Sequence, residues 1–126
     1  MAGQQRAHAA LGELLEERGD LRQAEASFRA AIASRPGESW IHHYFGLFLS
    51  RSLGDLAGAA KSYVAAIALA PEKTGPRQAR IQSELGTLQH QRGPGHIAEA
   101  EASYRAATGG NPEESQAHGN LGVVLL

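Results

Sequence analysis

The chain has 126 residues, enough for one domain of ordinary size, and its 12 basic and 13 acidic residues give a net charge of −1. The balanced charge, with basic residues that never form a run, disfavours nucleic acid and anionic membrane as partners. The absence of cysteine excludes disulfides, thiolate catalysis and Cys-based zinc sites. No stretch approaches the roughly 18 apolar residues of a membrane span, and the first residues lack the apolar core of a secretory signal. We therefore expect a cytoplasmic protein.

Residues 5–38 are predicted to form two helices joined at Gly19 and Asp20. The second helix carries apolar residues at three- and four-residue steps, the stripe of an amphipathic helix: Leu21, Ala24, Phe28, Ala31 and Ile32. A glycine just past a helix end is the usual left-handed cap, so Gly19 is expected to end the first helix. Pro36 then ends the second.

The same features return along the chain in the same order. A large apolar residue followed by glycine occurs at Leu11-Gly12, Phe45-Gly46, Leu85-Gly86 and Leu121-Gly122. An aromatic flanked by two alanines occurs at Ala24/Phe28/Ala31, Ala59/Tyr63/Ala66 and Ala100/Tyr104/Ala107. A glycine inside a helix costs about 1 kcal/mol relative to alanine, so its return at one phase predicts a site where a neighbouring helix leaves no room for a side chain. The alanines are expected to be buried in the same contact.

These spacings divide the chain into one all-α array of about seven helices. The predicted units are residues 5–38, 39–73 and 79–114, with an inserted junction at 74–78 and the first helix of a truncated fourth unit at 115–126. That last helix ends in apolar residues on more than one side, namely Leu121, Val123, Val124, Leu125 and Leu126. An uncovered apolar face marks an association site or a truncation. We expect a piece of a longer array, or self-association through residues 115–126.

The repeated unit, seen for example in LGELLEERGDLRQAEASFRAAIASRP, resembles the tetratricopeptide repeat, which has about 34 residues. The resemblance covers roughly residues 5 to 126 and implies a right-handed superhelical solenoid of antiparallel helix pairs. Two positions depart from the family pattern. The first-helix tryptophan is replaced by His8, His42, Gln82 and His118, and the following tyrosine by Leu15, Leu49 and Gln89.

No motif for catalysis or for a cofactor is present. There is no HExxH, no P-loop ending in Lys-Ser/Thr and no GxSxG. The adjacent His42 and His43 point about 100° apart on a helix and cannot hold one metal ion together. We therefore expect a protein that is not an enzyme and has no cofactor or metal.

In this family the first helices of the units form the inner wall of a concave groove, which implies a scaffold that binds a peptide or helix of a partner protein. The residues expected to line the groove are Arg6, Glu13, Trp40, His43, Leu47, Arg80, Thr87 and His90. The alternative is the regulatory or substrate-recruiting segment of a larger enzyme, such as a glycosyltransferase.

Two family sub-types can be compared by position. The members that bind chaperone tails hold a carboxylate with Lys, Asn and Arg, but the matching positions here are Ala9, Glu13, Tyr44, Arg80 and Glu84. The members attached to O-linked N-acetylglucosamine transferases carry an asparagine before the Leu-Gly pair, where this chain has Ala10, Tyr44, Glu84 and Asn120. Neither pattern is present, so the sequence does not identify the partner.

Overall fold

The computed structural model describes residues 2–110, which form six α-helices, two other helical turns and no strand. The helices are α1 (Ala2–Arg18), α2 (Leu21–Ser34), α3 (Ser39–Phe48), α4 (Leu56–Leu69), α5 (Pro76–Gln91) and α6 (Ile97–Gly110). A π-helical turn, η1 (Leu49–Leu53), continues α3, and a 3-10 turn, η2 (Pro94–His96), precedes α6. The predicted all-α fold is confirmed. The predicted helix at 115–126, with its proposed self-association, lies outside the described residues.

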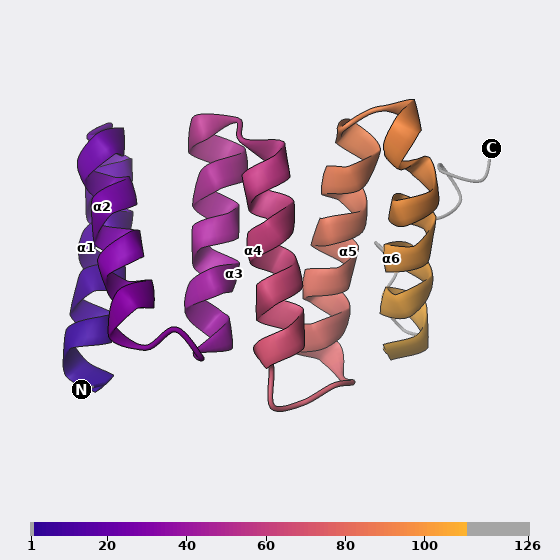
Figure 1. Ribbon diagram of the computed structural model, residues 1–126, viewed down its shortest axis with the longest axis horizontal. Helices are drawn as coiled ribbons and strands as arrows, with labels where there is room; N and C mark the ends of the chain where they lie inside the picture. Colours follow the sequence, from indigo (N-terminus) through magenta and orange to yellow (C-terminus); the bar gives the residue numbers. More distant parts are fainter. Residues whose placement is uncertain (1, 111–126) are drawn as a thin grey trace.

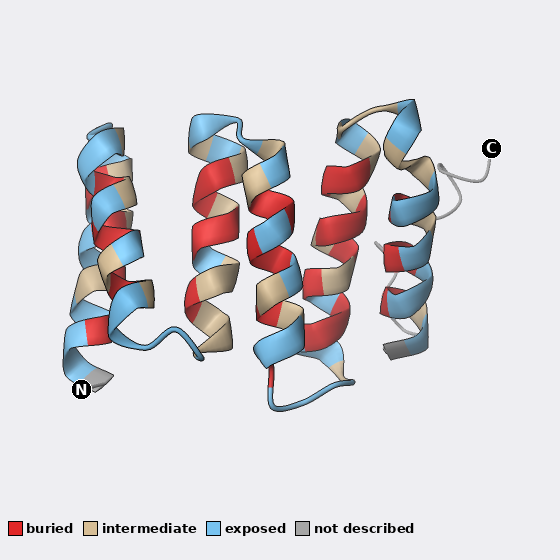
Figure 2. Ribbon diagram, in the orientation of Figure 1, coloured by how far each residue is buried: buried red, intermediate tan, exposed pale blue. Residues whose placement is uncertain are grey.

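The helices pack as three pairs, α1 with α2, α3 with α4 and α5 with α6, and the pairs follow one another in a row (Figure 1). Buried residues lie on the helix sides that face one another, whereas the outer sides and the turns are exposed (Figure 2). Each pair thus buries one stripe internally and shares the rest of its apolar surface with the next pair. This is the stacking expected of a helical repeat protein.

In each pair the glycine of the first helix lies against the aromatic ring of the second, a contact that was not predicted from the sequence. A Cβ atom at Gly12 would lie 3.0 Å from the ring of Phe28, and one at Gly46 would lie 2.8 Å from the ring of Tyr63. At Gly86 the distance to the Tyr104 ring would be only 2.5 Å. The alanines of the same contact are fully buried, namely Ala24, Ala59 and Ala100. The aromatic ring therefore lies directly on the backbone of the partner helix.

Left-handed glycines separate the two helices of each pair. Gly19, Gly54 and Gly93 have φ angles of 84°, 66° and 112°. Side chains rarely adopt this region, so glycine is favoured at these positions. Gly19 thus follows the end of α1 as predicted, and Gly54 and Gly93 hold the equivalent positions in the other two pairs. After Gly54 the side chain of Asp55 accepts a hydrogen bond from the Gly58 amide at 2.9 Å, which satisfies one free N–H at the start of α4.

Two segments are longer than the basic repeat. In the first, Gly75 has a φ of 110° and α5 begins at Pro76, so residues 76–78 form the first turn of that helix. Proline is common at this position because its missing N–H has no partner to lose there. In the second, the residues between α5 and α6 form the 3-10 turn η2. The first extra segment therefore lies partly in the connection and partly in α5, whereas the second lies in the turn before α6, where added residues cost little loop-closure entropy.

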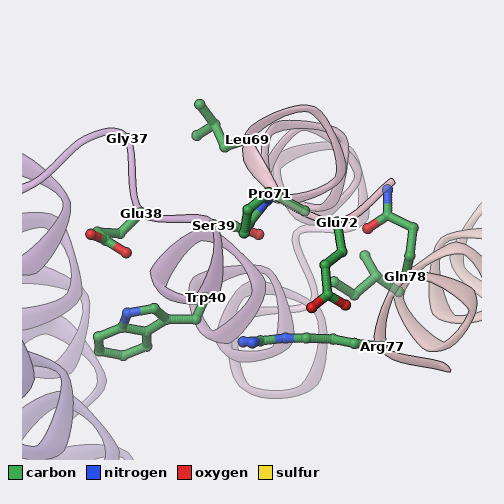
Figure 3. A pocket seen from close by; sticks show the side chains of 11 residues that line it. Gly37, Glu38, Ser39, Trp40, Leu69, Pro71, Glu72, Arg77 and Gln78 are labelled. Carbon is green, nitrogen blue, oxygen red and sulfur yellow. The ribbon is translucent and has the colours of Figure 1, made fainter. Parts of the chain in front are cut away.

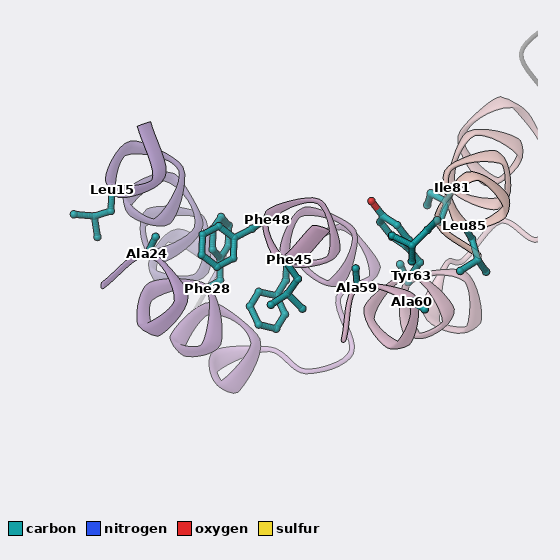
Figure 4. Close-up of a cluster of buried hydrophobic side chains, with 13 residues drawn as sticks. Leu15, Ala24, Phe28, Phe45, Phe48, Ala59, Ala60, Tyr63, Ile81 and Leu85 are labelled. Atoms are coloured by element: carbon teal, nitrogen blue, oxygen red, sulfur yellow. The ribbon is translucent and has the colours of Figure 1, made fainter. Parts of the chain in front are cut away.

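A continuous apolar core runs from α1 to α5 (Figure 4). At its centre the ring of Phe28 lies 6.1 Å from that of Phe45 and 5.2 Å from that of Phe48, measured between centroids. In the direction of α5 the core continues through Tyr63, Ile81 and other residues of the same cluster. These contacts hold successive pairs in a fixed arrangement, which positions the surface described next.

Gln89, which replaces the tyrosine of the family pattern, is buried with both ends of its amide paired. Its Nε2 donates to Oε2 of Glu99 at 3.1 Å, and Arg92 Nη1 donates to its Oε1 at 3.0 Å. A buried amide is tolerated when its polar atoms find partners. The polar replacement is therefore accommodated by a small hydrogen-bond network between α5 and α6.

Candidate protein-binding surface

The first helices of the three pairs surround one hollow of about 410 Å³, which we call the inner hollow. Its lining comes from α1, α3 and α5: Arg6, Ala9, Ala10, Glu13, Trp40, Tyr44 and Arg77. On α1 these residues recur at three- and four-residue steps, which places them on one face of the helix. On α3, Trp40 and Tyr44 are four residues apart and therefore lie one above the other.

An aromatic pair forms the middle of the inner hollow. The rings of Trp40 and Tyr44 meet edge to face, with centroids 5.8 Å apart and planes at 82°. Trp40 is half-buried and packs against the small cluster of Ala9, Ala31 and Ile41, while Tyr44 is 40% exposed. Rigid aromatic surface of this kind, held from behind and open in front, is typical of interface anchors.

Charged side chains flank the aromatic pair. Arg6 comes from α1 and Arg77 from α5, and both are exposed. Among the ion pairs of residues 2–110, none includes Arg6, Arg77 or Glu13. The hollow therefore presents two guanidinium groups and one carboxylate that internal pairing does not occupy.

Only some of the eight predicted groove residues line the inner hollow. Arg6, Glu13 and Trp40 come together in the inner hollow. Leu47 packs against the core, Arg80 is exposed, and His90 is half-buried. Neither Arg80 nor His90 is part of the hollow.

His43 and Thr87, also predicted for the groove, take part in internal hydrogen bonds. A ring nitrogen of His43 lies 2.9 Å from Oε2 of Glu84, which joins α3 to α5. The hydroxyl of Tyr104 donates to Oγ1 of Thr87 at 3.0 Å. These two residues therefore help to hold the helices that carry the surface.

Tyr63 lies against the His43–Glu84 pair, with its ring centroid 5.8 Å from that of His43. Burial raises the pKa of the Tyr63 phenol to about 12, and the charge of Glu84 acts in the same direction. The phenol therefore stays neutral over the whole range in which proteins usually work.

Arg77 lines the hollow but was not among the residues predicted from the sequence. Ala10 and Tyr44 were named there only as positions of family motifs. Arg77 falls in the predicted inserted junction, which in the structure is the first turn of α5. Gly75 followed by Pro76 is the available signal, because proline favours the first position of a helix. Taking α5 to start at Pro76 would have placed Arg77 on the same helix as Arg80.

A second hollow of about 390 Å³, which we call the end pocket, lies beside the first (Figure 3). It is formed by the loop before α3, the end of α4 and the start of α5. Its lining is Gly37, Glu38, Ser39, Trp40, Leu69, Ala70, Pro71, Glu72, Arg77, Gln78 and Ile81. Trp40 and Arg77 line both hollows, so the two are adjacent.

The described residues contain no group of three or more His, Cys, Asp or Glu side chains placed to hold a metal ion. Among residues 2–110, no helix is both long enough and apolar enough to cross a membrane.

The tetratricopeptide repeat family model matches residues 3–44 and 95–126, more than half of the chain. No curated protein matches the sequence significantly.

Solved structures of known tetratricopeptide domains superpose on nearly the whole chain. The first such domain of Spaghetti (RPAP3), bound to the HSP90 peptide SRMEEVD, is 15% identical with a TM-score of 0.82, over 99% of this chain and 93% of that one. The second domain of human RPAP3, in complex with the HSP70 peptide SGPTIEEVD, is 16% identical with a TM-score of 0.81, over 99% and 98%. The Yersinia enterocolitica chaperone SycD, in complex with a peptide of YopD, is 16% identical with a TM-score of 0.77, over 95% and 91%.

Proposed function

The chain belongs to the tetratricopeptide repeat family, and from this premise we propose that it is a protein-interaction scaffold whose inner hollow binds a peptide or helix of a partner. The observation that carries the proposal is the lining of this hollow, to which the first helices of all three pairs contribute. A ligand seated there contacts all three pairs at once, which is how a short repeat array obtains a binding surface larger than any single repeat offers.

The chemistry of the hollow supports a peptide ligand. The Trp40–Tyr44 pair offers fixed apolar area for an anchor side chain, and rigid aromatics lose little conformational entropy when they bind. Arg6 and Arg77 stand on opposite helices and can donate to carbonyl or carboxylate oxygens of a bound chain. The site thus combines one apolar anchor with flanking donors, the usual composition of an interface centre and its rim.

The ligand we propose differs from the chaperone tails bound to the two RPAP3 domains. At the positions that the family uses for a carboxylate clamp, Ala9 is buried, Glu84 contacts His43, and Glu13 carries a negative charge at the hollow itself. Of the five positions only Arg80 supplies a cation. The set of donors that the clamp needs is therefore incomplete, so we propose a peptide other than a chaperone tail.

Selection of peptides from a random displayed library on the full chain tests the proposal. Trp40 is the single tryptophan, so its fluorescence reports occupancy of the hollow directly. We expect selected peptides to change this fluorescence. Replacing Tyr44→Ala and Arg77→Glu together should weaken binding at least about tenfold, while Lys61→Ala, an exposed change on α4, should leave it unaltered.

Peptides that bind equally well to the double variant would contradict the proposal and place the site elsewhere. Unchanged circular dichroism of each variant shows that a loss of binding is not a loss of fold. Cell fractionation tests the expected cytoplasmic location.

A second candidate function is that this array recruits substrate proteins to a catalytic domain of the same polypeptide. The observation that favours it is the O-GlcNAc transferase of Thermobaculum terrenum, with which this chain shares 23% identity and a TM-score of 0.73, over 98% of this chain and 22% of that one. The same hollow would then hold the substrate protein. A catalytic domain encoded in the same reading frame would support this alternative over a free-standing scaffold.

A further inference from the structure

The end pocket adjoins the inner hollow at Trp40 and Arg77, so a peptide lying in the hollow can place one side chain into it (Figure 3). The pocket reaches between two helix pairs, from the loop before α3 to the start of α5. Its volume of about 390 Å³ is enough for one large side chain.

The walls of the end pocket are largely apolar. Trp40, Leu69 and Ile81 line it together with Ala70 and Pro71. Such walls favour a side chain with a long apolar stem, and the face of an indole ring attracts a cation that lies over it. Lysine and arginine combine the two properties.

The charges at the end pocket favour a cation. The lining contains the two carboxylates of Glu38 and Glu72 and one guanidinium, that of Arg77. Glu38 also lies 3.6 Å from Arg35, but both side chains are partly exposed, and an ion pair of this kind is weak and exchanges readily. The lining itself therefore carries one more negative than positive charge, while Arg35, the weak partner of Glu38, lies outside it.

The side chain of Gln78 is a second, independent indication that the end pocket favours a ligand with a hydrogen-bond donor. Its side chain is buried, with 7% exposed, and its Nε2 donates to the carbonyl of Ile67 at 3.3 Å. No donor among residues 2–110 reaches its Oε1, which in Figure 3 lies on the side of the amide that faces Glu72. A buried acceptor without a partner costs about 1–3 kcal/mol, so it favours a ligand that brings a donor and disfavours an anion.

The C-terminal end of α4 already binds one cationic side chain of this protein. The ammonium group of Lys73 binds the carbonyl oxygen of Ala68 at 2.7 Å, in the last turn of the helix that ends at the pocket. The C-terminal end of a helix carries partial negative charge and attracts cations. The pocket lies at this same end.

From these contacts we propose that the end pocket is a specificity site that receives a lysine or arginine side chain of the peptide bound in the inner hollow. The inference rests on the proposed function. In this arrangement the hollow supplies the anchor, and the carboxylates of Glu38 and Glu72 with the carbonyl oxygen of Gln78 select the charge of one ligand residue.

The experiment is the library selection described above, read position by position. Peptides selected on the full chain should be enriched in Lys or Arg at one fixed position. For the strongest peptide, replacing that residue by norleucine should raise Kd about tenfold, which corresponds to about 1.4 kcal/mol. In the double variant Glu38→Gln with Glu72→Gln, the basic and the norleucine peptides should bind with nearly equal affinity.

Glu17→Gln is the matched control, because Glu17 is an exposed carboxylate of α1 that lines neither hollow. This variant should keep the full preference for the basic peptide. Peptides selected without a basic position, an acidic enrichment, or a preference that survives in the double variant would overturn the inference and leave the proposed function standing. A chain that selects no peptide at all would overturn both.

Discussion

The two junctions between helix pairs use different chemistry. At the first, between α2 and α3, the rings of Phe28, Phe45 and Phe48 lie together (Figure 4), and the two ribbons lie further apart than those of α4 and α5 (Figure 1). At the second, Tyr63 of α4 stands beside the polar pair of His43 and Glu84. The first junction is thus filled by apolar rings, whereas the second places a polar pair beside its aromatic ring.

A charged contact reinforces the first junction at its edge. The carboxylate of Glu16 in α1 accepts two hydrogen bonds of 2.8 Å from Arg51, in η1, and a further one from the hydroxyl of Ser52. The repeat pattern therefore specifies the contacts within a pair, where glycine meets an aromatic ring each time. Contacts between pairs are specified individually, by residues that do not recur.

The largest expected effect is the loss of the phenyl ring from the first junction. Phe28 is fully buried and contacts Gly12 as well as two other phenylalanines. Phe28→Ala should lower the free energy of unfolding by about 3–5 kcal/mol, measured by urea denaturation. Ile81→Ala, at the second junction, should cost less. Val64→Ala, at an exposed position, should change little, and equal losses for Phe28 and Val64 would refute the assigned packing.

Replacing a helix glycine by alanine should destabilise the fold most where the added Cβ atom has least room. Gly86→Ala forces a methyl group to within 2.5 Å of the Tyr104 ring, whereas Gly12→Ala places it 3.0 Å from the Phe28 ring. Overpacking costs about 1–3 kcal/mol, and alanine returns about 1 kcal/mol of helix propensity. We expect a net loss of about 1–2 kcal/mol for Gly86→Ala and a change near zero for Gly12→Ala. The reverse order in thermal or urea unfolding would contradict the geometry.

Most of the fold could be predicted from the sequence because its determinants recur. The glycine, alanine and aromatic positions and the glycine caps each appear several times at one phase, so the period alone gives the helix pairs. The π-helical turn η1 and the bonds of Glu16 occur once, and no pattern indicated them.

The candidate surface was harder to predict, for a physical reason. Helical phase gives the face on which a side chain stands, and it correctly brought Arg6, Glu13 and Trp40 to one hollow. Phase does not say whether a neighbouring pair supplies a partner, as Glu84 does for His43. The face assigned to a residue also depends on where its helix starts. Because residues 74–78 were predicted to be a junction, Arg77 was not assigned to α5 or to the hollow.

A smaller effect is expected at the edge of the first junction. The hydrogen bonds from Arg51, with a further contribution from Ser52, hold the pKa of Glu16 below its usual value of 4.5. The lowered pKa contributes stability that is present above about pH 4.5 and is lost as the pH falls toward the folded-state pKa. Glu16→Gln should cost about 1–2 kcal/mol at pH 7, since Arg51 is half exposed to screening solvent.

The difference in unfolding free energy between wild type and Glu16→Gln should shrink below pH 4.5. Glu17→Gln, one residue along and exposed, serves as the control and should show little difference at any pH. A cost for Glu16→Gln that stayed constant down to pH 3 would mean that packing, not charge, accounts for the role of Glu16.

The smallest expected effect on stability comes from the hydroxyl group of Tyr63 at the second junction, which Phe28 at the first junction lacks. Tyr63→Phe makes the second aromatic position identical to the first and removes only a hydroxyl, so at pH 7 it should cost about 0.5–1 kcal/mol. The change should become visible at high pH. Because burial raises the pKa of Tyr63 from 10 to about 12, the unfolded chain releases the phenol proton before the folded chain does. The stability that the phenol contributes is therefore complete below pH 10 and is lost as the pH rises from 10 to about 12.

Urea denaturation of wild type and Tyr63→Phe at pH 9 and at pH 11 isolates this residue, because every other group titrates in both proteins. The wild-type chain should lose more stability than the variant between the two pH values, and equal losses would mean that the phenol of Tyr63 reaches solvent and is not enclosed beside His43 and Glu84.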